Sequence, residues 1–216
     1  SRAFRIAVVA ACVQAALHLG NALVLDRRVA NFDADVEGNM LAWAGSAAIF
    51  AAACASGLLA LLRPAARWAF GLLAAALAFL SLDETAAIHE RIGQAGVRVL
   101  DLSDDDYGRA IWPIVLFPML AGILLGLWRL ASAAPPDVGR TLRIGAGLLV
   151  AAVGAEFLWT AFPVSGGEVG SWPDALQVSL EEALELAGWV LVAAGLAWLA
   201  LSETLALAAR ASGRPT

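Results

Sequence analysis

Eight ionisable side chains stand inside or directly beside apolar stretches of this sequence. At the depth of a bilayer a charged side chain costs about 2.5–3.5 kcal/mol on insertion scales, so each such residue is a candidate for function. Three acids cluster within five residues, two more are adjacent, one stands alone in an apolar run, and the last two are the only histidines. The candidates are His18, Asp83, Glu84, His89, Glu156, Glu181, Glu182 and Glu185.

Imidazole and carboxylate groups together favour a divalent ion such as Zn, Mn or Fe over a soft metal. A bound ion polarises water, and a nearby carboxylate then acts as the base in hydrolysis. The residue types therefore predict a divalent metal site, with hydrolysis of a lipid or a lipid-linked substrate as its reaction. The predicted metal ligands are His18, His89, Glu156, Glu181 and Glu185. The predicted acids or bases are Asp83, Glu84 and Glu182.

Helical spacing places most of these candidates on faces that also carry small or polar residues. Residues three or four apart share a helix face, and small residues mark faces where membrane helices approach one another. We therefore expect four helices to direct polar groups into one cavity in the outer half of a bundle. The four stripes are Gln14, His18 and Asn21; Ser81, Thr85 and His89; Gly145, Ala152 and Glu156; Glu181, Glu185 and Gly188.

Each candidate also has an ordinary structural explanation. The glutamates of 181–185 fit a solvated helix start, which the helix dipole favours. Asp83 and Glu84 fit surface acids, Glu156 fits a protonated structural residue, and His18 fits a histidine that is hydrogen-bonded between helices. Several tryptophans near the ends of the apolar runs are typical of an interfacial belt. These are Trp43, Trp112, Trp159 and Trp172.

The elements that must position these residues are membrane-spanning helices. Apolar residues make up 61% of the 216 residues and charged residues 15%, against about 25% charged in an average soluble domain. A helix needs about 20 mainly apolar residues to cross a bilayer, and six runs qualify. The predicted fold is an all-α integral membrane protein, a six-helix bundle in a single transmembrane domain over residues 1–216. The predicted spans are 4–25, 40–62, 66–82 with an amphipathic continuation to about residue 99, 111–130, 141–163 and 174–201.

The arginines predict the orientation of these spans. All fourteen basic residues are Arg, and nine of them fall on the side of the two termini. The positive-inside rule therefore puts both termini in the cytoplasm, and the composition suggests the inner membrane of a bacterium. Seventeen of the nineteen acids fall on the outer side, which excludes nucleic-acid binding there. The absence of Lys excludes a cofactor held as a Schiff base.

Two further functions fit the sequence besides a metal-dependent hydrolase. A structural or accessory subunit of a larger membrane complex would use the acidic outer face to dock a basic partner. A proton- or cation-coupled transporter or channel would use the carboxylates as ion sites. The inner halves of the spans carry no second polar cluster, which counts against a transport path. The partners expected are the lipid bilayer, a lipid-linked substrate and other membrane subunits.

Overall fold

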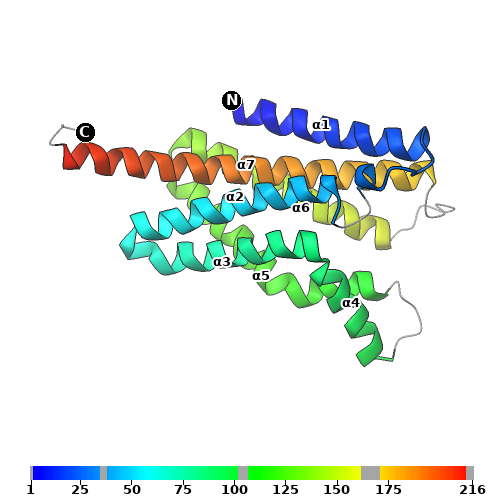
Figure 1. Ribbon diagram of the computed structural model, residues 1–216. Helices are drawn as coiled ribbons and strands as arrows, with labels where there is room; N and C mark the ends of the chain where they lie inside the picture. Colours follow the sequence, from blue (N-terminus) through cyan, green and yellow to red (C-terminus); the bar gives the residue numbers. More distant parts are fainter. Residues whose placement is uncertain (1, 35–37, 102–106, 162–170, 213–216) are drawn as a thin grey trace.

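The computed structural model describes the backbone of residues 2–34, 38–101, 107–161 and 171–212, and the side chains of these residues except 107–110 and 156–161. Across these ranges the regular elements are helices, and no strand occurs. The elements are α1 (Arg2–Leu23), η1 (Ala30–Phe32), α2 (Met40–Leu62), η2 (Pro64–Ala66), α3 (Arg67–Ala86), α4 (Ile88–Val99), α5 (Tyr107–Ala133), α6 (Pro136–Ala161) and α7 (Trp172–Ala211) (Figure 1).

Among the described residues, six helical segments are long and apolar enough to cross a membrane. They lie in α1, α2, α3 with η2, α5, α6 and α7, which confirms the predicted all-helical architecture and indicates a multi-pass membrane protein. The helices α1, α3 and α6 finish at the end of the bundle where α2, α5 and α7 begin. We call this end the acidic end, because Asp26, Asp33, Asp83, Asp101 and Asp174 lie there. The two termini lie toward the opposite end (Figure 1).

Large apolar side chains cover the outside of the bundle. Val9 on α1, Trp68 on α3, Ile114 on α5 and Trp198 on α7 are all exposed. Soluble monomers seldom expose contiguous apolar surface on this scale, whereas helices that face lipid require it. The surface therefore agrees with the apolar length of the six helices.

Local sequence explains where several helices begin. Asn39 caps α2, because its side-chain Oδ1 accepts the backbone N–H groups of Leu41 (2.8 Å) and Ala42 (3.0 Å). Proline is tolerated in a first turn, where the missing N–H has no helical partner to lose. The first turns of η2, α6 and α7 contain Pro64, Pro136 and Pro173, respectively.

The predicted continuation of the third span to about residue 99 is a separate helix, α4, which follows a break in the helix. α3 ends at Ala86, Ala87 adopts the left-handed conformation (φ 48°, ψ 45°), and α4 begins at Ile88. A left-handed residue interrupts a right-handed helix, so the chain turns here and α4 leaves the direction of α3 (Figure 1). α4 buries Gly93 and Val97 and packs against α5.

The last helix is longer than the predicted span of 174–201. α7 contains 40 residues. At about 1.5 Å per residue its length is about 60 Å, roughly twice the thickness of the hydrocarbon core of a bilayer. Its C-terminal part projects beyond the other helices (Figure 1). The other bounds lie within a few residues of the predicted ones, and residues 162 and 163 of the fifth predicted span fall outside the described ranges.

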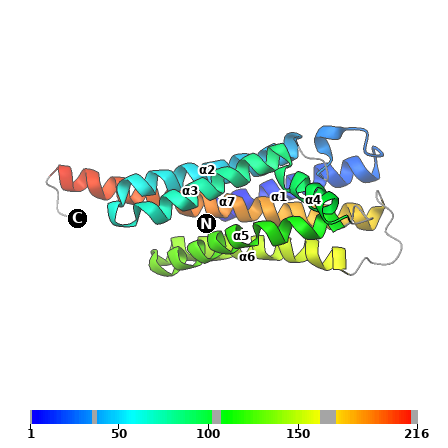
Figure 2. The same cartoon turned by 90° about the horizontal axis from the view of Figure 1, so that it is seen from below.

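α7 is the central helix of the bundle. It packs against α1, α2 and α6, while α3 packs on α2 and α5 packs on α6. The pair of α2 and α3 and the pair of α5 and α6 therefore lie on either side of α7 (Figure 2). α3 and α5 make few contacts with each other. The ring of helices α2, α3, α5, α6 and α7 is thus loosely closed between α3 and α5.

Glycines allow α6 and α7 to approach closely. A Cβ atom on Gly145 would lie 2.9 Å from the carbonyl oxygen of Gly188, and one on Gly188 would lie 3.1 Å from the carbonyl oxygen of Gly145. Such distances leave no room for a larger residue on either helix. Gly145 and Gly188 belong to two of the stripes that the sequence predicts to turn inward, and here the stripes do meet.

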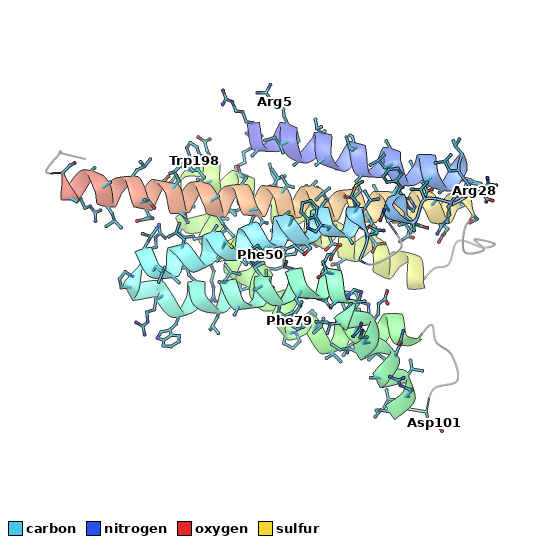
Figure 3. The ribbon with its side chains drawn as sticks, viewed as in Figure 1. Arg5, Arg28, Phe50, Phe79, Asp101 and Trp198 are labelled. Atoms are coloured by element: carbon cyan, nitrogen blue, oxygen red, sulfur yellow. The ribbon has the colours of Figure 1, made fainter. Side chains whose placement is uncertain are left out.

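Away from the acidic end the interior is packed with apolar side chains. Fully buried leucines from α2, α3, α5, α6 and α7 meet there. They are Leu59, Leu77, Leu127, Leu142 and Leu196. Trp198 of α7, in contrast, is exposed on the outside of the bundle (Figure 3). The described interior on this side is therefore mainly an apolar core, in which Ser56 of α2 is a buried polar residue.

Candidate functional site

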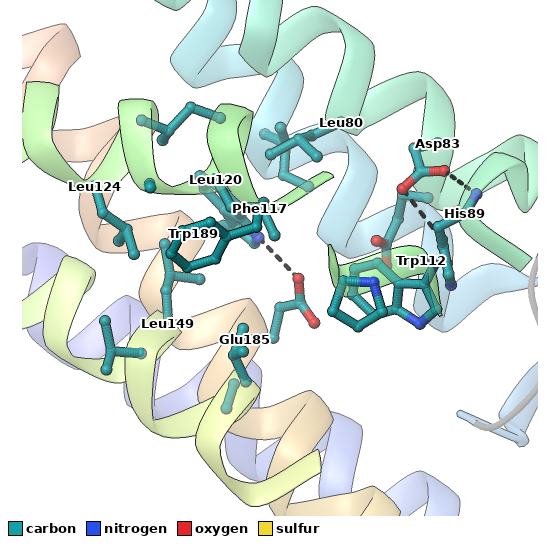
Figure 4. Close-up of a pocket in the computed structure, with 18 of the residues that line it drawn as sticks. Leu80, Asp83, His89, Trp112, Phe117, Leu120, Leu124, Leu149, Glu185 and Trp189 are labelled. Carbon is teal, nitrogen blue, oxygen red and sulfur yellow. Dashed lines mark hydrogen bonds and ion pairs between the residues drawn. The ribbon is translucent and has the colours of Figure 1, made fainter. Parts of the chain in front are cut away.

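A cavity of about 630 Å³ lies toward the acidic end, between α3, α5, α6 and α7. Its apolar wall comes mainly from α5 and α6, and its polar wall from α3, α4 and α7 (Figure 4). The apolar wall includes Ile114, Phe117, Leu120, Leu124, Leu149 and Val153. The polar wall consists of Asp83, Glu84, His89, Glu181, Glu182 and Glu185. Six of the eight residues singled out in the sequence thus line one cavity.

The cavity opens to the apolar outer surface of the bundle. Ile114 and Phe117 line it and are also 73% and 66% exposed, respectively. Both residues belong to α5, which makes few contacts with α3. The opening therefore faces sideways, in the direction that lipid would occupy around a membrane protein.

Asp83 holds His89 at the start of α4. Oδ1 of Asp83 accepts the backbone N–H of His89 (2.7 Å), and Oδ2 lies 3.1 Å from the ring Nδ1 (Figure 4). A carboxylate accepts hydrogen bonds, so this contact favours the tautomer with the proton on Nδ1. The indole ring of Trp112 packs against the imidazole, with 4.8 Å between the ring centroids. These contacts fix the orientation of the imidazole at the cavity wall.

Two glutamates of α7 accept hydrogen bonds from residues on their own helix. Oε1 of Glu185 accepts from Nε1 of Trp189 (3.1 Å), and Oε2 of Glu181 accepts from Nε2 of Gln177. Each donor stands four residues from its acceptor, which puts both on one helix face. Local contacts within α7 therefore help to orient both carboxylates.

Two further carboxylates connect the cavity to α1 and α2. Oε2 of Glu182 accepts from Nε2 of Gln14 (3.1 Å), and Gln14 is buried on α1. Oε1 of Glu84 lies against Gly45 of α2, where a Cβ atom would come within 3.1 Å of it. Residues of α1 and α2 therefore contact Glu182 and Glu84 of the polar wall.

His18 does not line this cavity, although the sequence analysis grouped it with His89 and the glutamates. It is fully buried, its Nδ1 accepts the N–H of Ala34 (2.8 Å), and the same Nδ1 lies 3.4 Å from Asp33. Arg27 binds Asp33 (3.6 Å) and Asp174 (2.8 Å) in the same network. α1 packs on α7 rather than on α3 or α5. Within its polar stripe, His18 and Asn21 bind the connection that follows α1, whereas Gln14 reaches Glu182 of α7. These contacts fit the alternative interpretation of His18 given above, in which it is a hydrogen-bonded structural histidine.

Glu156 belongs to α6, but its side chain lies outside the described residues. Ala152, four residues earlier on the same helix, lines the cavity. The predicted role of Glu156 as a ligand stays a prediction.

The described side chains form no group of three or more His, Cys, Asp and Glu residues that could hold a metal ion. The carboxyl groups line a wide cavity and do not converge on one point. Cys12 and Cys54 are free and exposed. The predicted metal site therefore has no support in the arrangement of these side chains.

Two tryptophans belong to the site although the sequence did not single them out for it. Trp189 stands four residues after Glu185, and this helical spacing was the available signal. Trp112 was assigned to an interfacial belt, and it reaches His89 only because α4 packs on α5. No local pattern predicts that second contact.

The sequence profile of a family described as "Domain of unknown function (DUF8692)" matches residues 3–199. The chain therefore belongs to this family, and the match includes all the cavity residues named above. Comparison with curated proteins gives no significant match, and neither does comparison with solved structures.

Proposed function

We propose that this member of the DUF8692 family binds a lipid or a lipid-linked molecule within the membrane, in the cavity between α3, α5, α6 and α7. The observation that carries the proposal is one cavity with both an apolar and a polar wall. The hydrocarbon part of the ligand would lie along Phe117 and Leu149. Its polar group would lie near Asp83, His89 and Glu185.

Size and access support this proposal. The volume of about 630 Å³ lies within the range of about 300–1,000 Å³ typical of small-molecule pockets, which combine apolar walls with a few polar groups. The exposed wall residues Ile114 and Phe117 would let a hydrocarbon chain enter from the bilayer without crossing water.

Native mass spectrometry of the detergent-purified protein tests the proposal, because it counts the lipids that remain bound. Ala121 lines the cavity, whereas Leu125, one turn further along α5, is exposed and does not line it. We expect Ala121→Trp to occupy part of the cavity and strongly reduce lipid retention, and Leu125→Trp to leave retention intact. Equal retention in both variants, or no bound lipid in the wild type, would contradict the proposal.

A divalent metal centre is a second candidate function, and the Asp83–His89 pair favours it. Histidines that bind metals usually donate their other ring N–H to a carboxylate, as the geometry of His89 Nδ1 allows. Nε2 of His89 and the carboxylates of Glu181 and Glu185 would then hold Zn, Mn or Fe after moving closer together. Such an ion would polarise water for hydrolysis of the bound lipid, with Glu84 or Glu182 as base.

Elemental analysis of protein purified without added metal tests this second candidate. Stoichiometric metal that is lost in His89→Gln and kept in His18→Gln would support it, because His18 does not line the cavity. Folded, lipid-binding protein without metal would exclude the metal centre and leave lipid binding untouched.

We also propose the inner membrane of a bacterium as the location, with both termini in the cytoplasm. The excess of Arg on the side of the termini supports this orientation. A C-terminal fusion to green fluorescent protein should fluoresce, and a fusion to alkaline phosphatase should be inactive. The reverse pattern would overturn the orientation.

Transport across the bundle receives less support. The interior opposite the acidic end is filled by residues such as Leu59, Leu127 and Leu142, which offer an ion no polar partner. A role as an accessory subunit has no specific contact in its favour among the described residues.

A further inference from the structure

We propose that α4 lies in the bilayer interface at the acidic end, with an apolar stripe inserted among the lipids and two arginines bound to phospholipid phosphates. α4 projects sideways from the bundle at this end (Figure 1). This role of α4 is separate from the binding of a ligand in the cavity.

α4 stands at the level where two spans meet the acidic end. The apolar segment Pro64–Ala86 has 23 residues. At about 1.5 Å per residue its length is about 34 Å, enough to cross a hydrocarbon core of about 30 Å. α4 begins two residues later, at Ile88. It also contacts the first residue of the apolar segment Ile111–Ala133, because a Cβ atom on Gly96 would lie 2.7 Å from Cγ2 of Ile111. α4 thus lies between the end of one span and the start of another, at the level of the lipid headgroups.

Three different faces run along α4. The first carries the buried residues Gly93 and Val97, and α4 packs on α5. The second is polar and exposed, and consists of Glu90, Arg91, Gln94 and Arg98. The third is apolar and consists of Ile88, Ile92, Ala95 and Val99. At about 3.6 residues per turn these faces are separated by roughly a third of a turn each. A helix that packs sideways on α5 can therefore turn its apolar face to the bilayer and its polar face to the headgroups and water.

The apolar face is unprotected at its end. Val99 is 83% exposed, and Leu100 directly after it is 61% exposed. An amphipathic helix at a membrane surface buries such a stripe at the boundary of headgroups and acyl chains, while its charged residues stay among the headgroups. Lipid would therefore cover the apolar face of α4.

The arginines of α4 suit the phosphate groups at this level. Arg91 and Arg98 are both exposed, and their spacing of seven residues places them on one helix face. The ion pairs described for arginine involve Arg27 and Arg63, and neither arginine of α4 has a charged partner among the described residues. Against these two arginines α4 carries one acid, Glu90. The planar guanidinium group binds phosphate through two parallel hydrogen bonds, so α4 complements a phospholipid surface.

Spin labelling of the full chain in liposomes of phosphatidylcholine and phosphatidylglycerol tests the position of α4. The exposed cysteines Cys12 and Cys54 are first replaced by Ala, and one label is then attached at Val99→Cys or at Gln94→Cys. Oxygen concentrates in the bilayer, whereas the nickel complex NiEDDA stays in water. We expect oxygen to relax the label at position 99 more strongly than NiEDDA does, and the reverse at position 94.

Solid-state NMR in the same liposomes tests the phosphate contacts. The dephasing of ¹⁵N-labelled arginine side chains by lipid ³¹P reports guanidinium groups that touch phosphates. Arg91→Gln/Arg98→Gln should remove the dephased signal of two side chains. Arg63→Gln removes an arginine that binds Glu203, and should keep the dephased signal of the wild type.

The alternatives give different results. Stronger relaxation by NiEDDA at both labelled positions would mean that α4 stands in water, and overturns the proposal. Protection of both labels from both reagents would mean that protein covers α4, and overturns it in favour of a second copy of the chain. Unchanged dephasing in the double variant overturns the phosphate contacts. If either labelled variant melts well below the wild type, Ala95→Cys on the apolar face and Glu90→Cys on the polar face repeat the comparison.

Discussion

Asp83, at the end of α3, binds both the backbone N–H and the ring of His89, at the start of α4. The two distances are 2.7 Å and 3.1 Å, and the contacts bridge the helix break at Ala87. One buried carboxylate therefore sets the direction of α4 and the orientation of the imidazole at the cavity.

Replacing this carboxylate should loosen α4. In Asp83→Asn one amide oxygen can still accept one of the two His89 N–H groups, but the amide NH₂ faces the other. A hydrogen bond to a charged group, worth about 1.5–3 kcal/mol, is therefore lost. Amide exchange in α4 should become roughly 10- to 100-fold faster by local opening, as measured by hydrogen–deuterium exchange. Glu90→Gln on the exposed face of α4 is the control. Unchanged exchange in Asp83→Asn would mean that packing on α5 alone holds α4.

The left-handed residue between α3 and α4 should favour glycine. Ala87 has φ 48°, which costs an alanine about 1–2 kcal/mol and a glycine almost nothing. After the larger entropy of an unfolded glycine is subtracted, Ala87→Gly should stabilise the protein by about 0.5–1 kcal/mol. Ala69→Gly, at an exposed position inside α3, should destabilise it by about 1 kcal/mol. Thermal melting in detergent compares the two variants. An equal decrease of the melting temperature in both would refute the strain at residue 87.

The contact between α6 and α7 should not accept a methyl group. Gly145→Ala places a Cβ atom 2.9 Å from the carbonyl oxygen of Gly188, so the helices must separate. A loss of about 1–3 kcal/mol is expected, measured as a lower melting temperature. Gly147→Ala, on a side of α6 with no atom within 4 Å, should be neutral or stabilising. Similar melting temperatures for the two variants would contradict the close approach.

His18 should matter for stability and not for the ligand. His18→Leu removes the acceptor of the Ala34 N–H, which should cost about 1–3 kcal/mol. His18→Asn restores an acceptor and should recover part of this loss in thermal melting. Lipid retention per folded molecule should equal that of the wild type in both variants. Loss of the lipid in a stable His18→Asn protein would instead indicate that His18 belongs to the ligand site, as the sequence analysis expected.

Most helix bounds followed from the sequence, because apolar runs and early prolines act locally. The break at Ala87 did not, since alanine is a strong helix former and nothing in its neighbours demands a left-handed residue. The candidate residues on α3 and α7 were also found locally: Asp83 and His89 are six residues apart, and Glu181 and Glu185 share one helix face. Whether any of them binds a metal or a lipid remains a prediction.

The sequence by itself determined six apolar helices and the face on which each polar residue lies, because helical periodicity relates a side chain only to its own helix. The tertiary structure decided which faces meet. It placed α1 against α7, so that Gln14 reaches Glu182 while His18 joins Asp33 in a separate network. It also brought Trp112 to His89 and left space between α3 and α5. Those contacts depend on how whole helices pack and on where glycines permit close approach, and periodicity within one helix contains no information about its neighbours.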